Sequence, residues 1–147
     1  MKSKVKIQTS FVSPVTLDYF KKNNILPVFI IRNIRNSELI GKWSNTAVHF
    51  RDFAPSNELF RSRRDGQIDT DSYKKQYALE ITERTNLQTF IDTLESLVEL
   101  SGAKSVVLLS YGSDYNSCHR SVLGMILNSS GLLENEVSEI KVWKEKY

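Results

Sequence analysis

Residues 105–131 read SVVLLSYGSDYNSCHRSVLGMILNSSG, and this stretch decides the fold. Its first part, residues 105–111, is a short apolar run of the kind found in strands buried inside a sheet. Residues 116–128 then place apolar side chains at helical spacing, and Asn116 or Ser117 is the predicted N-cap. A buried strand, a polar loop and a helix in this order indicate an α/β protein with a parallel sheet.

Two more strands are predicted upstream of this segment. Residues 5–9 alternate apolar and polar side chains, which suits a strand with one buried face. Residues 26–31 are almost continuously apolar, as expected for a strand covered by helices on both faces. Between them, Ser13-Pro14 predicts the start of a short helix, and the Lys-Lys-Asn-Asn run at residues 21–24 predicts its end.

The middle of the chain, residues 33–71, has no sustained hydrophobic period and is predicted to be a long loop with a short helix at residues 56–61. Asp71 or Ser72 is predicted to cap the next helix. A further helix is expected over residues 87–98, because apolar side chains recur there at helical spacing. The last predicted strand is marked by Val137, Ile140, Val142 and Trp143.

Composition fits one domain over residues 1–147, because 147 residues with 40% hydrophobic side chains can enclose one core. Cys118 is the only cysteine and His49 and His119 are the only histidines, which excludes an intramolecular disulfide and a closed cysteine/histidine zinc site. No metal and no cofactor is therefore predicted.

No apolar run approaches the roughly 20 residues that cross a bilayer, and the N-terminus does not resemble a signal peptide. The expected location is the cytoplasm, with no membrane partner. The net charge of +3 comes from 20 basic and 17 acidic residues. This balance is compatible with an anionic partner but is not by itself typical of a nucleic-acid-binding protein.

Polar residues follow two of the predicted strands, at the sheet edge where open parallel sheets bind ligands. Arg32 follows one strand, and Cys118, His119 and Arg120 are expected in the first helical turn after the other. Free backbone N–H groups in that turn favour an anion, and Arg120 adds a fork-shaped cationic donor. These residues predict an anion pocket in which Arg32 and Arg120 hold the ligand.

Each residue of this turn also has a structural interpretation. A lone cysteine at a helix start is more often a packing residue than a nucleophile, although a helix terminus lowers the pKa of a thiol. His119 is either a hydrogen-bonded orienting residue or an acid/base group, with Asp114 as a second acid/base candidate. Arg120 either binds the ligand or forms an ion pair with Asp114 or with an acid of the middle segment.

Several reaction classes are disfavoured by spacing. Gly124 stands where a phosphatase motif would place an arginine six residues after Cys118, and no P-loop or dinucleotide glycine pattern is present. Trp43 and Tyr111 are the candidates for stacking on a ligand ring, so a nucleotide or nucleoside is the favoured anionic ligand.

A separate basic cluster suggests a different function. Arg61, Arg63 and Arg64 lie beside Phe60, with Arg51 upstream, and could grip a phosphate backbone. The alternative is a solvated helix end balanced by neighbouring acidic residues.

The run from Val106 to Tyr111 followed by Cys118-His119-Arg120 resembles the signature of domain of unknown function 488 (DUF488), a family found in bacteria, archaea and phages. The likeness to its shorter members extends from Ile7 to Leu132, with further landmarks at Arg32, Trp43, Ala54-Pro55-Ser56, Glu58-Leu59, Gly66, Ile68-Asp69, Tyr73 and Tyr77. The resemblance implies a Rossmann-like three-layer sandwich and assigns no reaction.

This chain departs from the family pattern at several positions. Many members carry cysteine in place of Ser110 and glutamate in place of Gly112, and Asp114 is the nearest replacement for that carboxylate. Asn33 and Ile34 stand where a glycine and a proline often follow the early arginine.

Three functions are therefore expected from the sequence. The first is an enzyme or sensor that binds an anionic small molecule, of nucleotide or nucleoside type, at the carboxyl edge of the sheet. The second is a nucleic-acid-associated module that binds DNA or RNA through Arg51, Arg61, Arg63 and Arg64. The third is a non-enzymatic protein-interaction adaptor, which the missing glutamate suggests.

Overall fold

The structure is a computed structural model that describes residues 2–32 and 48–141. Trp43 and two residues of the predicted last strand, Val142 and Trp143, lie outside the described residues. The strands are β1 (Ile7–Phe11), β2 (Ile25–Phe29), β3 (Val48–His49), β4 (Ser105–Ser110) and β5 (Ser138–Glu139). The helices are α1 (Pro14–Lys22), α3 (Asn57–Arg64), α4 (Thr70–Arg84), α5 (Leu87–Ser101) and α6 (His119–Ser129), with 3-10 turns η1 (Arg51–Phe53) and η2 (Tyr115–Ser117).

The strands form one five-stranded sheet in the order β3-β2-β4-β1-β5, and every pairing in it is parallel. This confirms the predicted α/β class and parallel sheet, with one strand more than the four expected. The additional strand is β3, which lies inside the segment predicted to be a loop. Because β3 has only two residues, it is too short to give a detectable alternation.

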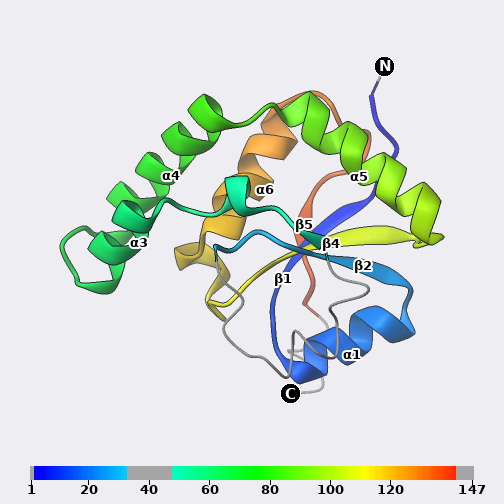
Figure 1. Cartoon of the computed structure of the whole chain (residues 1–147), viewed down its shortest axis with the longest axis horizontal. Coiled ribbons are helices and arrows are strands. Elements are labelled where there is room, and N and C mark those ends of the chain that lie inside the picture. Colours follow the sequence, from blue (N-terminus) through cyan, green and yellow to red (C-terminus); the bar gives the residue numbers. More distant parts are fainter. Residues whose placement is uncertain (1, 33–47, 142–147) are drawn as a thin grey trace.

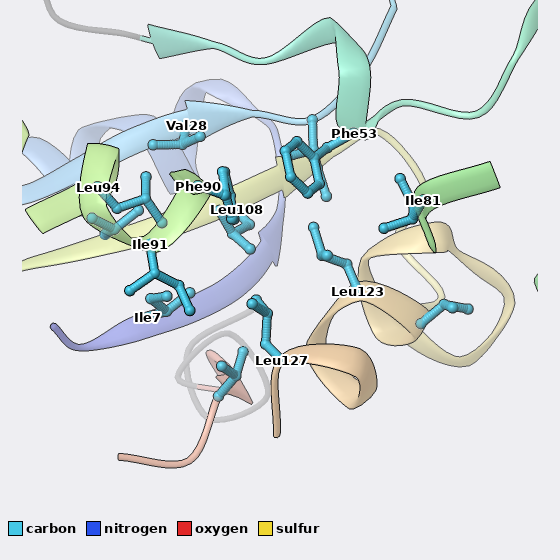
Figure 2. Close-up of a cluster of buried hydrophobic side chains, with 14 of the residues drawn as sticks. Ile7, Val28, Phe53, Ile81, Phe90, Ile91, Leu94, Leu108, Leu123 and Leu127 are labelled. Atoms are coloured by element: carbon cyan, nitrogen blue, oxygen red, sulfur yellow. The ribbon is translucent and has the colours of Figure 1, made fainter. Parts of the chain in front are cut away.

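Helices cover both faces of the sheet, so the molecule has three layers (Figure 1). Helix α1 lies on one face, where Leu17 and Phe20 pack with Phe29, Val107 and Leu109 of the sheet. Helices α4, α5 and α6 cover the other face, where the larger cluster lies (Figure 2). Successive residues of β4 point into opposite clusters, since Val106 and Leu108 belong to the larger cluster and Val107 and Leu109 to the smaller.

Two helix starts differ from those expected. Helix α4 is capped by Asp69, whose side chain accepts a hydrogen bond from the Ser72 backbone N–H, and not by Asp71 or Ser72. Helix α6 begins at His119, and its N-cap is Cys118 and not Asn116 or Ser117, so Cys118 lies just before the first turn and not within it. The cause is Asp114, whose side chain accepts from the Asn116 backbone N–H and thereby caps the separate turn η2.

In the part of the chain that the structure describes, no helix combines the length and the apolar character needed to cross a membrane.

Candidate functional site

The candidate site lies at the carboxyl edge of the central strands, where β4 leads through η2 into α6. Strand β4 is buried along its whole length and ends at Ser110. Cys118 then precedes the first turn of α6, and its backbone is extended with φ of −104°. This conformation turns the chain into the helix and brings the cysteine side chain back to the end of β4.

The Cys118 sulfur is held between two polar side chains. Its Sγ atom lies 2.8 Å from Ser110 Oγ and 3.8 Å from His119 Nδ1. The loop backbone approaches it as well, because a β-carbon added to Gly112 would lie 3.5 Å from Sγ. The cysteine residue as a whole is partly exposed.

This environment favours the thiolate. Burial on its own raises the pKa of the Cys118 thiol, but the hydrogen bond and charge of His119, the hydrogen bond of Ser110 and the charge of Arg120 together lower it to about 6. A thiol with this pKa is mostly ionised at pH 7, and the thiolate is the nucleophilic form.

The main chain fixes His119 in position. Its Nε2 atom lies at hydrogen-bond distance from the carbonyl oxygen of Ile30, the residue directly after β2, and the His119 residue is buried. A carbonyl oxygen can only accept, so Nε2 carries a proton and Nδ1 faces the Cys118 sulfur. The sulfur, the imidazole and the Ile30 carbonyl thus follow one another in a chain of polar contacts.

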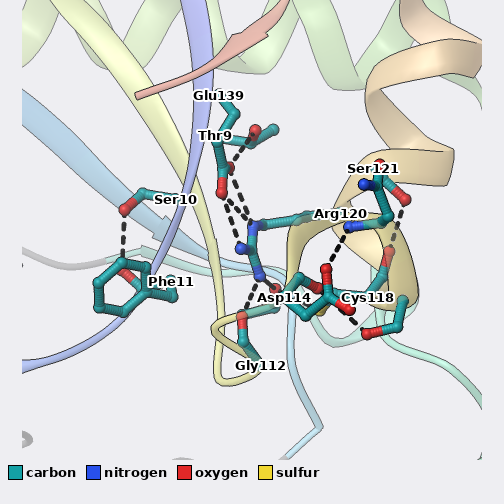
Figure 3. A network of polar contacts seen from close by, with 12 residues as sticks. Thr9, Ser10, Phe11, Gly112, Asp114, Cys118, Arg120, Ser121 and Glu139 are labelled. Atoms are coloured by element: carbon teal, nitrogen blue, oxygen red, sulfur yellow. Dashed lines mark hydrogen bonds and ion pairs between the residues drawn. The ribbon is translucent and has the colours of Figure 1, made fainter. Parts of the chain in front are cut away.

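Arg120 is fully buried, and Figure 3 shows its side chain between Glu139 and the Gly112 loop. Its Nη2 atom lies 2.7 Å from Glu139 Oε2, its Nη1 atom donates to Ser110 Oγ at 3.0 Å, and Nη1 also donates to the Gly112 carbonyl. The acid partner is thus Glu139 of β5, and not Asp114 or a residue of the middle segment. The guanidinium ties β4, the Gly112 loop and β5 together.

The other predicted site residues lie around this centre. Arg32 is partly buried and its Nε donates to the Pro55 carbonyl at 3.3 Å. Asp114 is exposed and caps η2. Tyr111 is partly buried and packs against the cluster beneath α1, on the opposite face of the sheet from α6. The structure therefore brings Cys118 and His119 together, with Arg120 behind them.

The four arginines of the basic cluster divide between two elements. Arg51 is exposed in η1, whereas the other three lie in α3, in which Arg61 and Arg64 are exposed. Arg63 Nη2 donates to Thr70 Oγ1 at 2.7 Å, and Arg64 pairs with Asp65 at 3.0 Å.

Sequence reasoning missed Ser110 and Glu139 as members of the site. The position of Ser110 at the end of a buried strand was a usable signal, because that edge of the sheet is where ligands bind. Glu139 gave no local signal, since its role depends on the pairing of β5 with β1. Among residues 2–32 and 48–141, no group of three or more histidine, cysteine, aspartate or glutamate side chains is placed to hold a metal ion.

Fold and site together define an α/β protein with a cysteine–histidine pair at the carboxyl edge of a parallel sheet. Residues 29–131 match the family described as the active DUF488-N3 subclade. Because this match spans more than half of the chain, the protein belongs to the DUF488 family, as its sequence signature predicted. Searches of curated proteins and of solved structures gave no match.

Proposed function

We propose that this protein is an enzyme that binds an anionic small molecule at the carboxyl edge of its sheet and attacks it with the Cys118 thiolate. The observation that carries the proposal is the placement of Cys118 Sγ between Ser110 Oγ and His119 Nδ1, at 2.8 and 3.8 Å. This arrangement favours nucleophilic catalysis over the packing role that is commoner for a lone cysteine.

The chemistry follows from the two side chains. When the thiol proton moves to His119 Nδ1, the pair becomes a thiolate beside an imidazolium. The thiolate attacks an electrophilic carbon of the substrate and forms a covalent carbon–sulfur bond. The proton on Nδ1 is then available to the leaving group, so His119 serves as general acid in the same step.

The substrate anion is assigned to Arg32 and the first turn of α6. Arg32 follows the end of β2 and makes a single hydrogen bond, at 3.3 Å, among those found in the described residues. The start of α6 adds free N–H groups and a positive dipole end. Arg120 is assigned a structural role and not direct ligand binding, because its side chain is buried and its charge is neutralised by Glu139. Nucleotides and nucleosides are the first ligand class to test.

A thermal-shift screen against nucleotides, nucleosides and simple anions tests the binding part of this proposal. A ligand at one hundred times its dissociation constant stabilises a protein by about 2.7 kcal/mol, so modest binders register. The shift is expected to disappear in Arg32→Ala and to persist in Cys118→Ala, which removes only the nucleophile. Intact mass measurement of the parent protein with each hit detects a covalent adduct, and an adduct that also forms on Cys118→Ala contradicts the mechanism.

The second candidate function is nucleic-acid binding through Arg51, Arg61, Arg63 and Arg64. It is favoured by the position of α3, which lies beside α4 at one end of the molecule (Figure 1) and exposes Arg61 and Arg64. Release of counterions makes such binding fall steeply with salt concentration. Binding of a short DNA or RNA that is lost in Arg61→Ala/Arg64→Ala and weakens with salt supports this function, and salt-independent binding argues against it.

A further inference from the structure

Tyr73 is a buried residue whose hydroxyl group makes no hydrogen bond in the part of the chain that the structure describes. Its side chain lies in the first turns of α4 and only 6% of the residue is exposed. Tyr77, one helical turn later on the same face, is also buried, but its hydroxyl donates to the Phe53 carbonyl at 2.6 Å. Buried polar groups are usually paired, so the hydroxyl of Tyr73 requires an explanation that Tyr77 does not.

The packing of α4 on α6 places Tyr73 at the same end of this helix pair as the candidate nucleophile. The ring of Tyr77 lies 5.2 Å from the ring of His119, in an edge-on arrangement. Helices α4 and α6 run in the same direction (Figure 1), and Tyr73 lies one turn closer to the start of α4 than Tyr77. Tyr73 is therefore level with the start of α6, where Cys118 precedes His119.

The electrostatic environment of Tyr73 agrees with this placement and indicates that its hydroxyl group is protonated. Burial raises the pKa of Tyr73 above its ordinary value, and the negative charge of the Cys118 thiolate raises it further. The phenol therefore keeps its proton while the thiolate is formed. A protonated hydroxyl at the cysteine end of the helix pair, with no acceptor among residues 2–32 and 48–141, is a hydrogen-bond donor available to a third group.

We infer that the Tyr73 hydroxyl donates a hydrogen bond to the substrate oxygen that becomes negatively charged when Cys118 attacks a carbonyl-type carbon. This inference rests on the proposed function, and it narrows the substrate to compounds with a C=O group at the reacting carbon. In the step itself, the sulfur lone pair forms the C–S bond and the π electrons move onto oxygen. The oxyanion then collapses, and the leaving group departs with the electron pair of its bond.

Two probes of the single cysteine separate this role from a structural one. p-Nitrophenyl acetate acylates a thiolate through an oxyanion and releases p-nitrophenolate, whereas iodoacetamide alkylates it by displacing iodide, with no oxyanion. Tyr73→Phe is expected to slow acylation by about tenfold or more, a lower bound on what oxyanion donors contribute. Its alkylation rate is expected to stay within about twofold of the parent, because the thiolate is unchanged.

Tyr19→Phe is the matched control, since Tyr19 lies in α1 beside Phe20, on the other face of the sheet, and both of its rates should equal those of the parent. Cys118→Ala gives the background rate for each reagent. Tyr73→Met also lacks the hydroxyl and provides a second measurement should Tyr73→Phe fold poorly.

The outcomes distinguish a failure of the proposed function from a failure of the role of Tyr73. Parent protein that is not alkylated near neutral pH overturns the proposed function, and the role of Tyr73 with it. Parent protein that is alkylated but not acylated leaves the nucleophile in place and overturns only the role of Tyr73. Equal rates in Tyr73→Phe and the parent, or an equal loss in both reactions, likewise overturn only the role of Tyr73.

Discussion

Arg120 and Glu139 form an ion pair, with Nη2 lying 2.7 Å from Oε2, although one residue lies in the first turn of α6 and the other on the edge strand β5. The arginine side chain is fully buried, whereas 11% of the glutamate side chain is exposed. The pair therefore joins helix α6 to the sheet edge, and the buried charge of Arg120 depends on Glu139 for its neutralisation.

Glu139→Gln is expected to destabilise the protein by about 3 kcal/mol, because it leaves a buried guanidinium without its counter-charge. Arg120→Met should cost less, since the freed carboxylate of Glu139 can turn toward water. Urea denaturation of the parent and both variants measures these differences. The matched control is Arg64→Met, which breaks the exposed pair with Asp65 and should change stability by less than about 0.5 kcal/mol. Equal effects of Glu139→Gln and Arg64→Met would contradict the prediction.

The alkylation rate of Cys118 by iodoacetamide is expected to rise with pH around a midpoint of about 6. His119→Asn should move this midpoint upward, because burial raises the pKa of the thiol once the imidazole no longer offsets it. His49→Asn is the control, since His49 contacts the neighbouring carbonyl of Ile31 and is not among the groups that lower the pKa of Cys118. If the pH midpoint of alkylation were unchanged in His119→Asn, His119 would not be the group that lowers the pKa of Cys118.

The same lowered pKa has a consequence for stability. A group whose folded pKa lies below its unfolded value stabilises the native state above the unfolded pKa and loses that contribution as pH falls. For Cys118 the loss occurs between the ordinary thiol range and pH of about 6. The stability difference between the parent and Cys118→Ala should therefore shrink as pH is lowered across this window.

Ser110→Ala is expected to raise the midpoint of Cys118 alkylation, because the thiolate loses its hydroxyl neighbour at 2.8 Å. Stability should also fall by about 1 kcal/mol, since Arg120 Nη1 loses an acceptor. Ser10→Ala provides the comparison: Ser10 is equally buried in β1, and its hydroxyl donates to the Phe11 carbonyl. Ser10→Ala is expected to lose stability without any change in the pH midpoint of Cys118 alkylation. If Ser110→Ala gave the same result, Ser110 would have no role in stabilising the thiolate.

Asp69→Ala is expected to lower the melting temperature, whereas Asp71→Ala should leave it nearly unchanged, because Asp69 caps α4. The hydrogen bond from the Ser72 backbone lowers the pKa of Asp69, so its contribution is present above the unfolded pKa and is lost as pH falls. Melting curves at neutral and acidic pH should show the two variants converging in acid. If Asp71→Ala lowered the melting temperature more than Asp69→Ala, Asp71 would be the cap of α4, as expected from the sequence.

The sequence was sufficient for the parts of the fold that depend on local patterns. Strand β4 was predicted because its apolar run indicates burial on both faces, and helix α5 because its apolar residues recur at helical spacing. The N-cap of α6 was misplaced by one or two residues, because Asn116, Ser117 and Asp114 are all good capping residues. Only the three-dimensional path of the loop shows that Asp114 caps its own turn and leaves Cys118 at the helix start.

The candidate site was predictable in position but not in its internal contacts. Cys118, His119 and Arg120 follow a buried strand, and that order alone placed them at the sheet edge. The division of roles among them depends on groups distant in sequence: Ile30 supplies the acceptor for His119, and Glu139 supplies the counter-charge of Arg120. These long-range contacts follow from parallel pairing across the sheet, for which a single sequence carries no local signal.

The position of Glu139 on β5 also determines when, during synthesis of the chain, the start of α6 can pack. Strands β1, β2 and β4 and helix α6 all leave the ribosome before residue 139 does. Until then Arg120 has no carboxylate at its guanidinium, and burying an unpaired charge is strongly unfavourable. The start of α6, and with it the cysteine–histidine pair, can therefore settle into place only after β5 has been made and has paired with β1.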